Sequence, residues 1–188
     1  MNQKVQSKFS NTQKFNRKGA IAMRIQKSSV IMDSNHQNIL VKDFAKNYSG
    51  VDSLHQPENI VKVMNDIFNV SNLAEEYLFL ICMTTRCKPI SIFEVSHGTC
   101  NSSLVGCREI MIRALLCGAV NIVVVHNHPS GNAQPSLEDV KVTKKIKDAS
   151  KLIGLNFCDH IIIGQDGYFS FSQNDIFDRK IVGKNYML

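Results

Sequence analysis

The sequence predicts an α/β domain in which helices alternate with the strands of one mixed sheet. Apolar runs such as "LFLICM" and "NIVVV" are too continuous for strands that keep one face in water. Between these runs lie segments whose apolar residues recur at helical spacing. With 44% hydrophobic and 20% charged residues, the 188-residue chain has an ordinary globular composition. We therefore expect a domain with a real core.

The predicted order over residues 55–175 is helix, two strands, helix, strand, helix, two strands. The first helix is "PENIVKVMNDIF", since Pro57 suits a first helical turn. The hairpin consists of "EYLFLICM" and "PISIFEV", joined by "TTRCK". A helix in "SLVGCREIMIRALLCGA" ends at Gly118, and a buried strand, "VNIVVVH", follows it. The remaining elements are the helix "SLEDVKVTKKIKDASKLIG", closed by Gly154, and the strands "LNFCDHIIIG" and "YFSF".

The two ends of the chain are expected to lie outside this domain. Residues 1–50 are polar and form a predicted disordered tail, and residues 176–188 form a C-terminal tail. Residues 1–32 carry seven Lys and Arg and no Asp or Glu, so the net charge of +6 belongs to this tail. Such a tail could make weak contacts with nucleic acid, whereas the rest of the chain has no basic excess.

Cysteine usage and hydropathy exclude several classes of protein. None of the six cysteines forms a C-x-x-C pair, which argues against a zinc ribbon. Cys82 and Cys117 lie in apolar surroundings, so we expect free thiols. No apolar run approaches the roughly 20 residues that a bilayer requires, and no apolar segment of a secretory signal follows the basic N-terminus. The sequence therefore predicts a cytoplasmic protein that does not enter membranes.

The segment "HNHPSG" follows the strand "NIVVV" and predicts a metal site. Residues two apart in a strand point to the same face, so His126 and His128 project together. Asp139 lies in the first turn of the next helix and is the best candidate for a third ligand. Two other interpretations stay open: the histidines could be polar loop residues, and Ser136 with Asp139 fits an ordinary helix-capping pattern.

Two enzyme classes with related signatures do not fit these residues. The residues that name HNH nucleases are scattered over a ββα unit, so the contiguous letters "HNH" are a coincidence of spelling. Zinc deaminases need H-x-E and P-C-x-x-C, and this sequence contains neither at the histidine pair.

The segment "HNHPSGNAQPSLED" resembles the JAB/MPN (JAMM) metalloprotease motif, H-x-H-x(7)-S-x(2)-D, at every spacing. The form "HNHPSG" is typical of the RadC-like branch of that superfamily. The blocks "EYLFLICM", "SHGTCNSSLVGCREIMIRAL", "DHIIIG" and "YFSF" also match in order, so the resemblance covers residues 57–173. It implies an MPN/JAB-type (cytidine-deaminase-like) mixed β-sheet flanked by helices.

The resemblance also implies a function and a role for each motif residue. It predicts a zinc-dependent hydrolase that cleaves a peptide or isopeptide bond in a protein or peptide substrate. Zn²⁺ is held by His126, His128 and Asp139, and the hydroxyl of Ser136 helps to hold the oxyanion. A glutamate activates the attacking water; Glu76 is the preferred candidate, with Glu75 and Glu94 as alternatives, because Glu76 opens the preceding strand.

Residues outside the motif have less specific interpretations. Asp159 and His160 match a family block and either support the zinc ligands from behind or form a satisfied core pair. Arg108 and Glu109 are expected to be a structural pair at a helix start, and His97 an ordinary loop histidine.

Two other functions stay open at this stage. One is a DNA-repair or DNA-associated protein that binds nucleic acid through the basic tail, because RadC-like proteins have long carried that label. Residues 1–55 lack the G-x-G hairpins of the DNA-binding module that longer family members carry. The other is a zinc-binding scaffold without catalysis.

Overall fold

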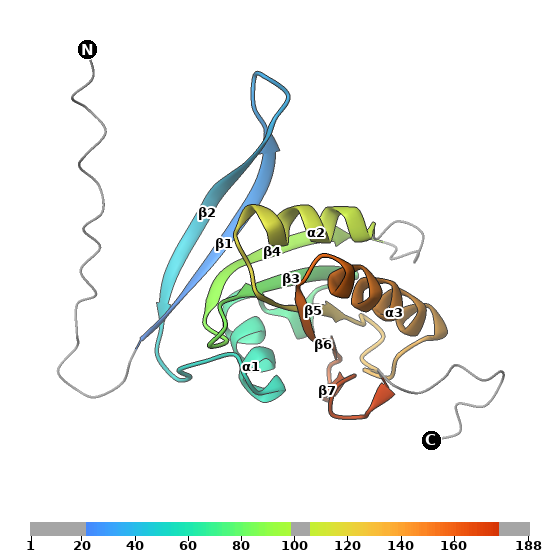
Figure 1. Ribbon diagram of the computed structural model, residues 1–188. Coiled ribbons are helices and arrows are strands. Elements are labelled where there is room, and N and C mark those ends of the chain that lie inside the picture. The colour runs from blue at the N-terminus through green and yellow to red at the C-terminus, as the bar shows by residue number, and fades with distance from the viewer. Residues whose placement is uncertain (1–21, 99–105, 177–188) are drawn as a thin grey trace, which may run out of the picture.

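The computed structural model describes residues 22–98 and 106–176 (Figure 1). Within these ranges, three helices and one short 3-10 turn pack around a single seven-stranded sheet. The strands are Met23–Met32 (β1), Asn38–Tyr48 (β2), Tyr77–Met83 (β3), Pro89–His97 (β4), Asn121–Asn127 (β5), Asn156–Ile163 (β6) and Tyr168–Ser170 (β7). The helices are Pro57–Phe68 (α1), Cys107–Leu116 (α2) and Leu137–Leu152 (α3), and the 3-10 turn is Val70–Asn72.

The sheet is mixed and has the order β2-β1-β4-β3-β5-β6-β7. The predicted hairpin of β3 and β4 is present, and β3 also pairs antiparallel with β5. Strands β5 and β6 are parallel, as expected for strands joined by a helix, here α3. Because β3 and β5 lie inside the sheet and are covered on both faces, β3 and the centre of β5 (Ile122–Val125) are continuously apolar. The predicted α/β class is confirmed.

Strand alternation divides the core between the two faces of the sheet. On one face, Phe79 and Ile81 of β3 and Val125 of β5 pack in a cluster with α1. On the other face, Leu80 of β3 and Val124 of β5 pack in a cluster with α2 and α3. In Figure 1 the helices α2 and α3 lie together over one face of the sheet. Side chains at even positions of β5 therefore face the α3 layer.

The N-terminal segment corrects one prediction. Residues 23–48 form an antiparallel hairpin of β1 and β2 instead of the expected disordered tail, and its tip projects beyond α2 (Figure 1). Strand β1 also pairs with β4, Ile25 is fully buried, and Lys27 forms an ion pair with Glu94 at 3.0 Å. Nearly every residue of β2 is exposed, so the pattern of a buried strand is absent there. The sequence therefore gives no clear signal for this hairpin.

Parts of the predicted tails remain untested. Residues 1–21 of the predicted disordered tail and residues 177–188 of the predicted C-terminal tail lie outside the described residues. No helix within residues 22–98 and 106–176 is long and apolar enough to cross a membrane. The five cysteines in these ranges are free, as expected, while Cys100 lies outside them.

Candidate metal centre

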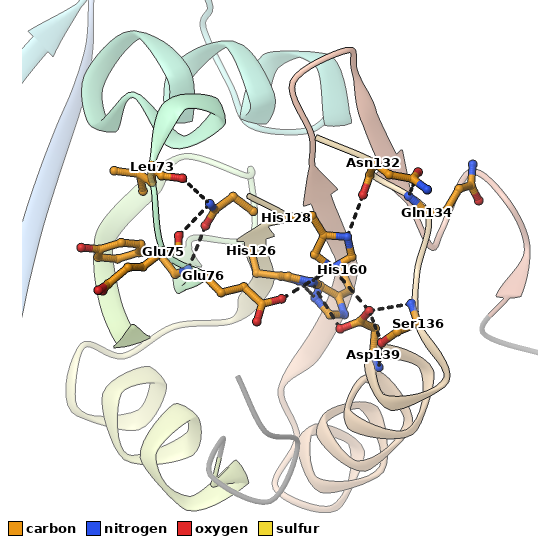
Figure 2. A network of polar contacts seen from close by, with 12 residues as sticks. Leu73, Glu75, Glu76, His126, His128, Asn132, Gln134, Ser136, Asp139 and His160 are labelled. Atoms are coloured by element: carbon orange, nitrogen blue, oxygen red, sulfur yellow. Dashed lines mark hydrogen bonds and ion pairs between the residues drawn. The ribbon is translucent and has the colours of Figure 1, made fainter. Parts of the chain in front are cut away.

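The two histidines of the motif meet at the carboxyl end of β5 (Figure 2). Alternation along β5 turns both rings toward the α3 layer, as the sequence predicted. Their Nε2 atoms lie 2.9 Å apart, and His126 is only 2% exposed. The interpretation of these histidines as unrelated loop residues therefore does not hold.

Asp139 reaches the histidine pair from the first turn of α3. One carboxylate oxygen lies 3.3 Å from His126 Nε2, and the other lies 3.6 Å from His128 Nε2. The same carboxylate caps the helix, because its Oδ2 accepts hydrogen bonds from the backbone N–H (2.7 Å) and the hydroxyl (2.6 Å) of Ser136. The Ser136 Oγ in turn accepts from the Asp139 N–H. The capping interpretation is thus correct, and it is compatible with ligation because the cap holds Asp139 against the histidines.

Glu76 reaches the histidine pair from a different element, the loop that precedes β3 (Figure 2). Its Oε1 lies 3.7 Å from His128 Nε2, and the ligand atoms of Glu76, His126 and His128 all lie within 4.8 Å of one another. Glu94 is engaged elsewhere, with Lys27 at 3.0 Å and His97 at 3.1 Å. The geometry therefore favours Glu76 over Glu94 as the glutamate of the site.

Asn127 holds the loop that carries Glu76. It is 1% exposed and points to the α1 side of the sheet, opposite to its histidine neighbours. Its side-chain oxygen accepts from the Tyr77 N–H at 2.8 Å, and its amide nitrogen donates to the carbonyls of Glu75 (2.9 Å) and Leu73 (3.3 Å). Asn127 thus fixes the backbone on both sides of Glu76.

The ionisation of these groups suits a cation. Burial of the Asp139 carboxyl raises its pKa, but the contacts with the imidazoles of His126 and His128 and the hydrogen bond from Ser136 outweigh burial and bring the pKa well below its usual value. The hydrogen bond with Asp139 raises the pKa of His128, against the opposing effect of its partial burial. The site therefore keeps Asp139 negative and attracts positive charge between the carboxylates.

The donor set fits a metal ion such as Zn²⁺. His128 Nδ1 lies 2.8 Å from the carbonyl oxygen of Asn132. A carbonyl can only accept, so Nδ1 carries the hydrogen and the neutral ring presents a lone pair at Nε2. Two imidazole nitrogens with carboxylates beside them are the ligand types that zinc takes in catalytic sites.

The comparisons with known proteins agree with this geometry. A sequence profile of the RadC-like JAB domain matches residues 54–176, which is well over half of the chain. This chain belongs to the RadC-like JAB domain family.

Relatives of this RadC-like JAB domain include proteins named UPF0758. The chain is 43% identical to one from Clostridium tetani over 104 residues, which is 55% of this chain and 46% of the relative. It is 37% identical to one from Clostridium perfringens over 123 residues (65% and 53%) and 33% identical to one from Caldanaerobacter subterraneus over 126 residues (67% and 53%). The chain thus spans about half the length of these relatives.

The predicted pair Asp159 and His160 has two separate roles in this RadC-like JAB domain. His160 Nε2 lies 2.8 Å from His126 Nδ1, so His160 does stand directly behind a predicted ligand. The Asp159 carboxylate instead accepts hydrogen bonds from the Ser170 hydroxyl (2.5 Å) and the Ser172 N–H (2.9 Å). Adjacent residues of a strand face opposite sides, which is why only His160 meets the metal centre.

The remaining predicted residues behave as structural groups. Arg108 and Glu109 form an exposed pair at 3.5 Å in the first turn of α2. The ring of His97 stacks on Tyr77, with centroids 5.3 Å apart. Neither arrangement places these residues among the ligand atoms of the RadC-like site.

Asn127 and Thr143 belong to the site although no motif in the sequence points to them. Thr143 Oγ1 lies 2.5 Å from His160 Nδ1 and donates to the backbone carbonyl of Asp139 at 2.6 Å. A signal for Thr143 was available, since it lies four residues after Asp139 and so one turn further along α3. No comparable local signal marks Asn127, because its partners precede it by about fifty positions.

Proposed function

We propose that this chain is a zinc-dependent hydrolase that cleaves peptide or isopeptide bonds. The observation that carries the proposal is the pair of Nε2 atoms 2.9 Å apart, with the carboxylates of Asp139 and Glu76 beside it. Zn²⁺ bound there would lower the pKa of a water molecule to about 7 and polarise a substrate carbonyl.

The three residues of the motif's ligand set are His126, His128 and Asp139. Asp139 contacts both Nε2 atoms, at 3.3 and 3.6 Å, and Glu76 Oε1 lies 3.7 Å from His128 Nε2. Asp139 is also held rigidly by the capping box, which suits a ligand. At 3.7 Å from His128 Nε2, Glu76 Oε1 is near enough for its carboxylate to exchange a proton with a water molecule at the metal.

Glu76 acts as the general base in this mechanism. Its carboxylate takes a proton from the attacking water and delivers it to the nitrogen of the leaving amine. Asn127 keeps Glu76 in reach by binding the backbone of both neighbouring residues. The carbonyl oxygen of the substrate gains negative charge during attack and needs a hydrogen-bond donor.

Ser136 is the donor that we assign to this oxygen. In the structure its hydroxyl donates to Asp139 Oδ2 at 2.6 Å. Rotation about its side chain would turn that hydrogen toward a substrate, while the Ser136 N–H continues to hold Asp139. The Ser136 hydroxyl thus donates to Asp139 before the water attacks and to the negatively charged substrate oxygen during the attack.

The test combines metal analysis with a screen of peptide and isopeptide cleavage. We expect purified wild-type protein to contain zinc and to cleave a substrate, and His128→Ala to lose both. A wild-type protein without affinity for zinc would contradict the proposal. Bound zinc without any cleavage would instead indicate a scaffold.

Glu76→Gln separates the base from the ligands. We expect this variant to retain zinc and to lose about 10²–10⁴-fold in kcat, because the amide cannot accept the proton of the water. Glu94→Gln is the matched control and should keep its turnover, since Glu94 pairs with Lys27 and His97. Full activity of Glu76→Gln would remove Glu76 from the mechanism.

A further inference from the structure

A buried line of hydrogen bonds leads from one candidate ligand to the backbone of another. His126 Nδ1 lies 2.8 Å from His160 Nε2, and His160 Nδ1 lies 2.5 Å from Thr143 Oγ1. The Thr143 hydroxyl ends the line at the carbonyl oxygen of Asp139, 2.6 Å away. His160 is 1% exposed and Thr143 is 3% exposed, so water does not compete for these groups.

The direction of each hydrogen bond can be deduced by starting from the bond at the end of the line, between Thr143 and the Asp139 carbonyl. The Asp139 carbonyl can only accept, so the single hydroxyl hydrogen of Thr143 points to it. If that hydrogen pointed to His160 instead, two oxygen acceptors would face each other at 2.6 Å without a hydrogen. Thr143 Oγ1 therefore accepts from His160, whose Nδ1 carries a hydrogen.

The tautomer of His126 follows in the same way. His160 is 1% exposed, and its ring nitrogens contact a histidine and a threonine, so no carboxylate at either nitrogen would offset the charge of an imidazolium and the ring is neutral. A neutral ring with hydrogen on Nδ1 has a lone pair on Nε2, which accepts from His126 Nδ1. His126 thus carries its hydrogen on Nδ1 and turns the lone pair of Nε2 toward His128 and Asp139.

We propose that His160, held by Thr143, is a positioning residue that fixes His126 in its Nδ1–H tautomer and so presents Nε2 as a metal ligand. The hydrogen bond at the second nitrogen of an imidazole decides which nitrogen binds metal. Because the line ends on the Asp139 backbone, it also ties β5 to the first turns of α3, which carry the other ligand. The role of His160 in ligation rests on the proposed function, whereas the tautomer itself does not.

The first measurement reads the tautomers directly, by ¹⁵N NMR of the imidazole rings in the metal-free full-length protein. The pH is set well above about 6.5, where ordinary imidazoles are neutral. We expect hydrogen on Nδ1 of both His126 and His160 and none on Nε2 of His160. A wild-type spectrum with His126 Nδ1 bare would overturn the proposal.

The second measurement is zinc affinity in two variants of Thr143. Thr143→Val removes the hydroxyl at almost constant shape, and Thr143→Ser keeps it as the matched control. We expect Thr143→Val to alter the ring signals of His126 and to bind zinc about 10–100-fold more weakly, while Thr143→Ser behaves as wild type. Unchanged affinity and ring signals in a folded Thr143→Val protein would overturn the proposal.

A third pair of variants tests His160 itself. In His160→Gln, an amide oxygen is available to accept from His126 and an amide N–H to donate to Thr143, whereas His160→Phe can do neither. We expect His160→Phe to lose zinc affinity by about 10–100-fold and His160→Gln to recover part of it. Wild-type affinity in a folded His160→Phe protein would contradict the positioning role.

These experiments separate the two proposals. Failure to bind zinc or to cleave any substrate contradicts the proposed function and leaves the tautomer measurement intact. Zinc-dependent cleavage in the wild type, combined with unchanged zinc affinity in Thr143→Val and His160→Phe, contradicts the positioning role alone.

Discussion

At the scale of single residues, the candidate metal centre depends on side chains that face opposite sides of one strand. His126 faces α3 and its partner His160, while Asn127 faces the other layer and binds the loop of Glu76. Three consecutive residues of the sequence, "HNH", therefore assemble a site from both sides of β5. Two of them offer ligand atoms, and the middle one organises the backbone beside the glutamate.

Replacement of Asn127 by Ala should lower stability and loosen the loop that carries Glu76. The change leaves the Tyr77 N–H and two loop carbonyls without their Asn127 partner, at a cost of about 1–3 kcal/mol for each group that water cannot reach. Chemical denaturation measures the loss, and the zinc content of the folded fraction should stay near that of wild type. A variant as stable as wild type would show that this clamp contributes little.

The buried Asp159 gives a dependence on pH that can be isolated by mutation. Burial raises its pKa above the usual 3.8, despite the opposing hydrogen bonds from Ser170 and Ser172. Between 3.8 and the raised pKa the folded state holds a proton that the unfolded state releases. The free energy of unfolding of the wild type should therefore fall as the pH rises through this window.

Asp159→Asn is the comparison, measured by denaturation at a series of pH values. The difference in stability, variant minus wild type, should rise with pH across the window and stay constant below about 3.8. Ser170 can reverse its hydrogen bond to accept from the new amide. A difference that does not change with pH would show that Asp159 titrates equally in both states.

At the scale of elements, the hairpin of β1 and β2 is the part of the fold that local sequence signals did not reveal. Strand β1 is buried along one side only: Met23, Ile25 and Ser28 are buried, while the residues between them are mostly polar. Ser28 hydrogen-bonds Ser91 of β4 at 2.7 Å, so a polar contact replaces apolar packing at that point. A search for apolar runs passes over such a strand.

Ile25→Ala tests whether this hairpin is integral to the domain. Ile25 is fully buried in the core cluster of α1, so we expect a loss of about 2–5 kcal/mol in the free energy of unfolding. Ile39→Ala on β2 is the matched control; Ile39 is 39% exposed, and its replacement should cost far less. Equal losses of unfolding free energy in the two variants would show that residues 23–48 are only loosely attached to the domain.

At the scale of the whole molecule, the metal centre joins three separate parts of the chain. Glu76 comes from the loop before β3, the histidines from β5 and Asp139 from α3. A cation bound by the two histidines and Asp139 would join the end of β5 to α3, beside the loop of Glu76, in the folded state only. Metal binding should therefore be coupled to the stability of the domain as a whole.

Removal of zinc should lower the thermal stability of the protein. At free zinc about 100-fold above its Kd, the bound ion would add about 2.7 kcal/mol, so a chelator should reduce Tm by several degrees. Differential scanning calorimetry with and without chelator measures this shift. His128→Ala is the control and should show no response to zinc; an identical response in both proteins would place the metal elsewhere.

The charge of the molecule is distributed differently from the expectation of a free basic tail over residues 1–32. Lys27 lies in β1 and is paired with Glu94 across the sheet, so it does not belong to such a tail. Five Lys and Arg residues lie in residues 1–21, outside the described part of the chain.

Much of the domain could be predicted because its signals are local. The apolar runs of β3 and β5, Pro57 at the start of α1 and Gly154 after α3 each mark an element within a few residues. The ligand spacing is equally local, since strand alternation and the first turn of a helix place His126, His128 and Asp139 without reference to distant residues. The sequence by itself thus determined the α/β class, the helices, the central strands and the candidate ligands.

Only the tertiary structure decided which distant residues complete the sheet and the candidate site. Three sets of contacts join segments that lie from 17 to 67 positions apart in the sequence. They are the pairing of β1 with β4, the hydrogen bonds of Asn127 to the loop of Glu76, and the line from His126 through His160 to Thr143. Polar side chains of this kind have several possible partners in the sequence. Burial selects among them, because a polar group removed from water must find its hydrogen bond within the fold.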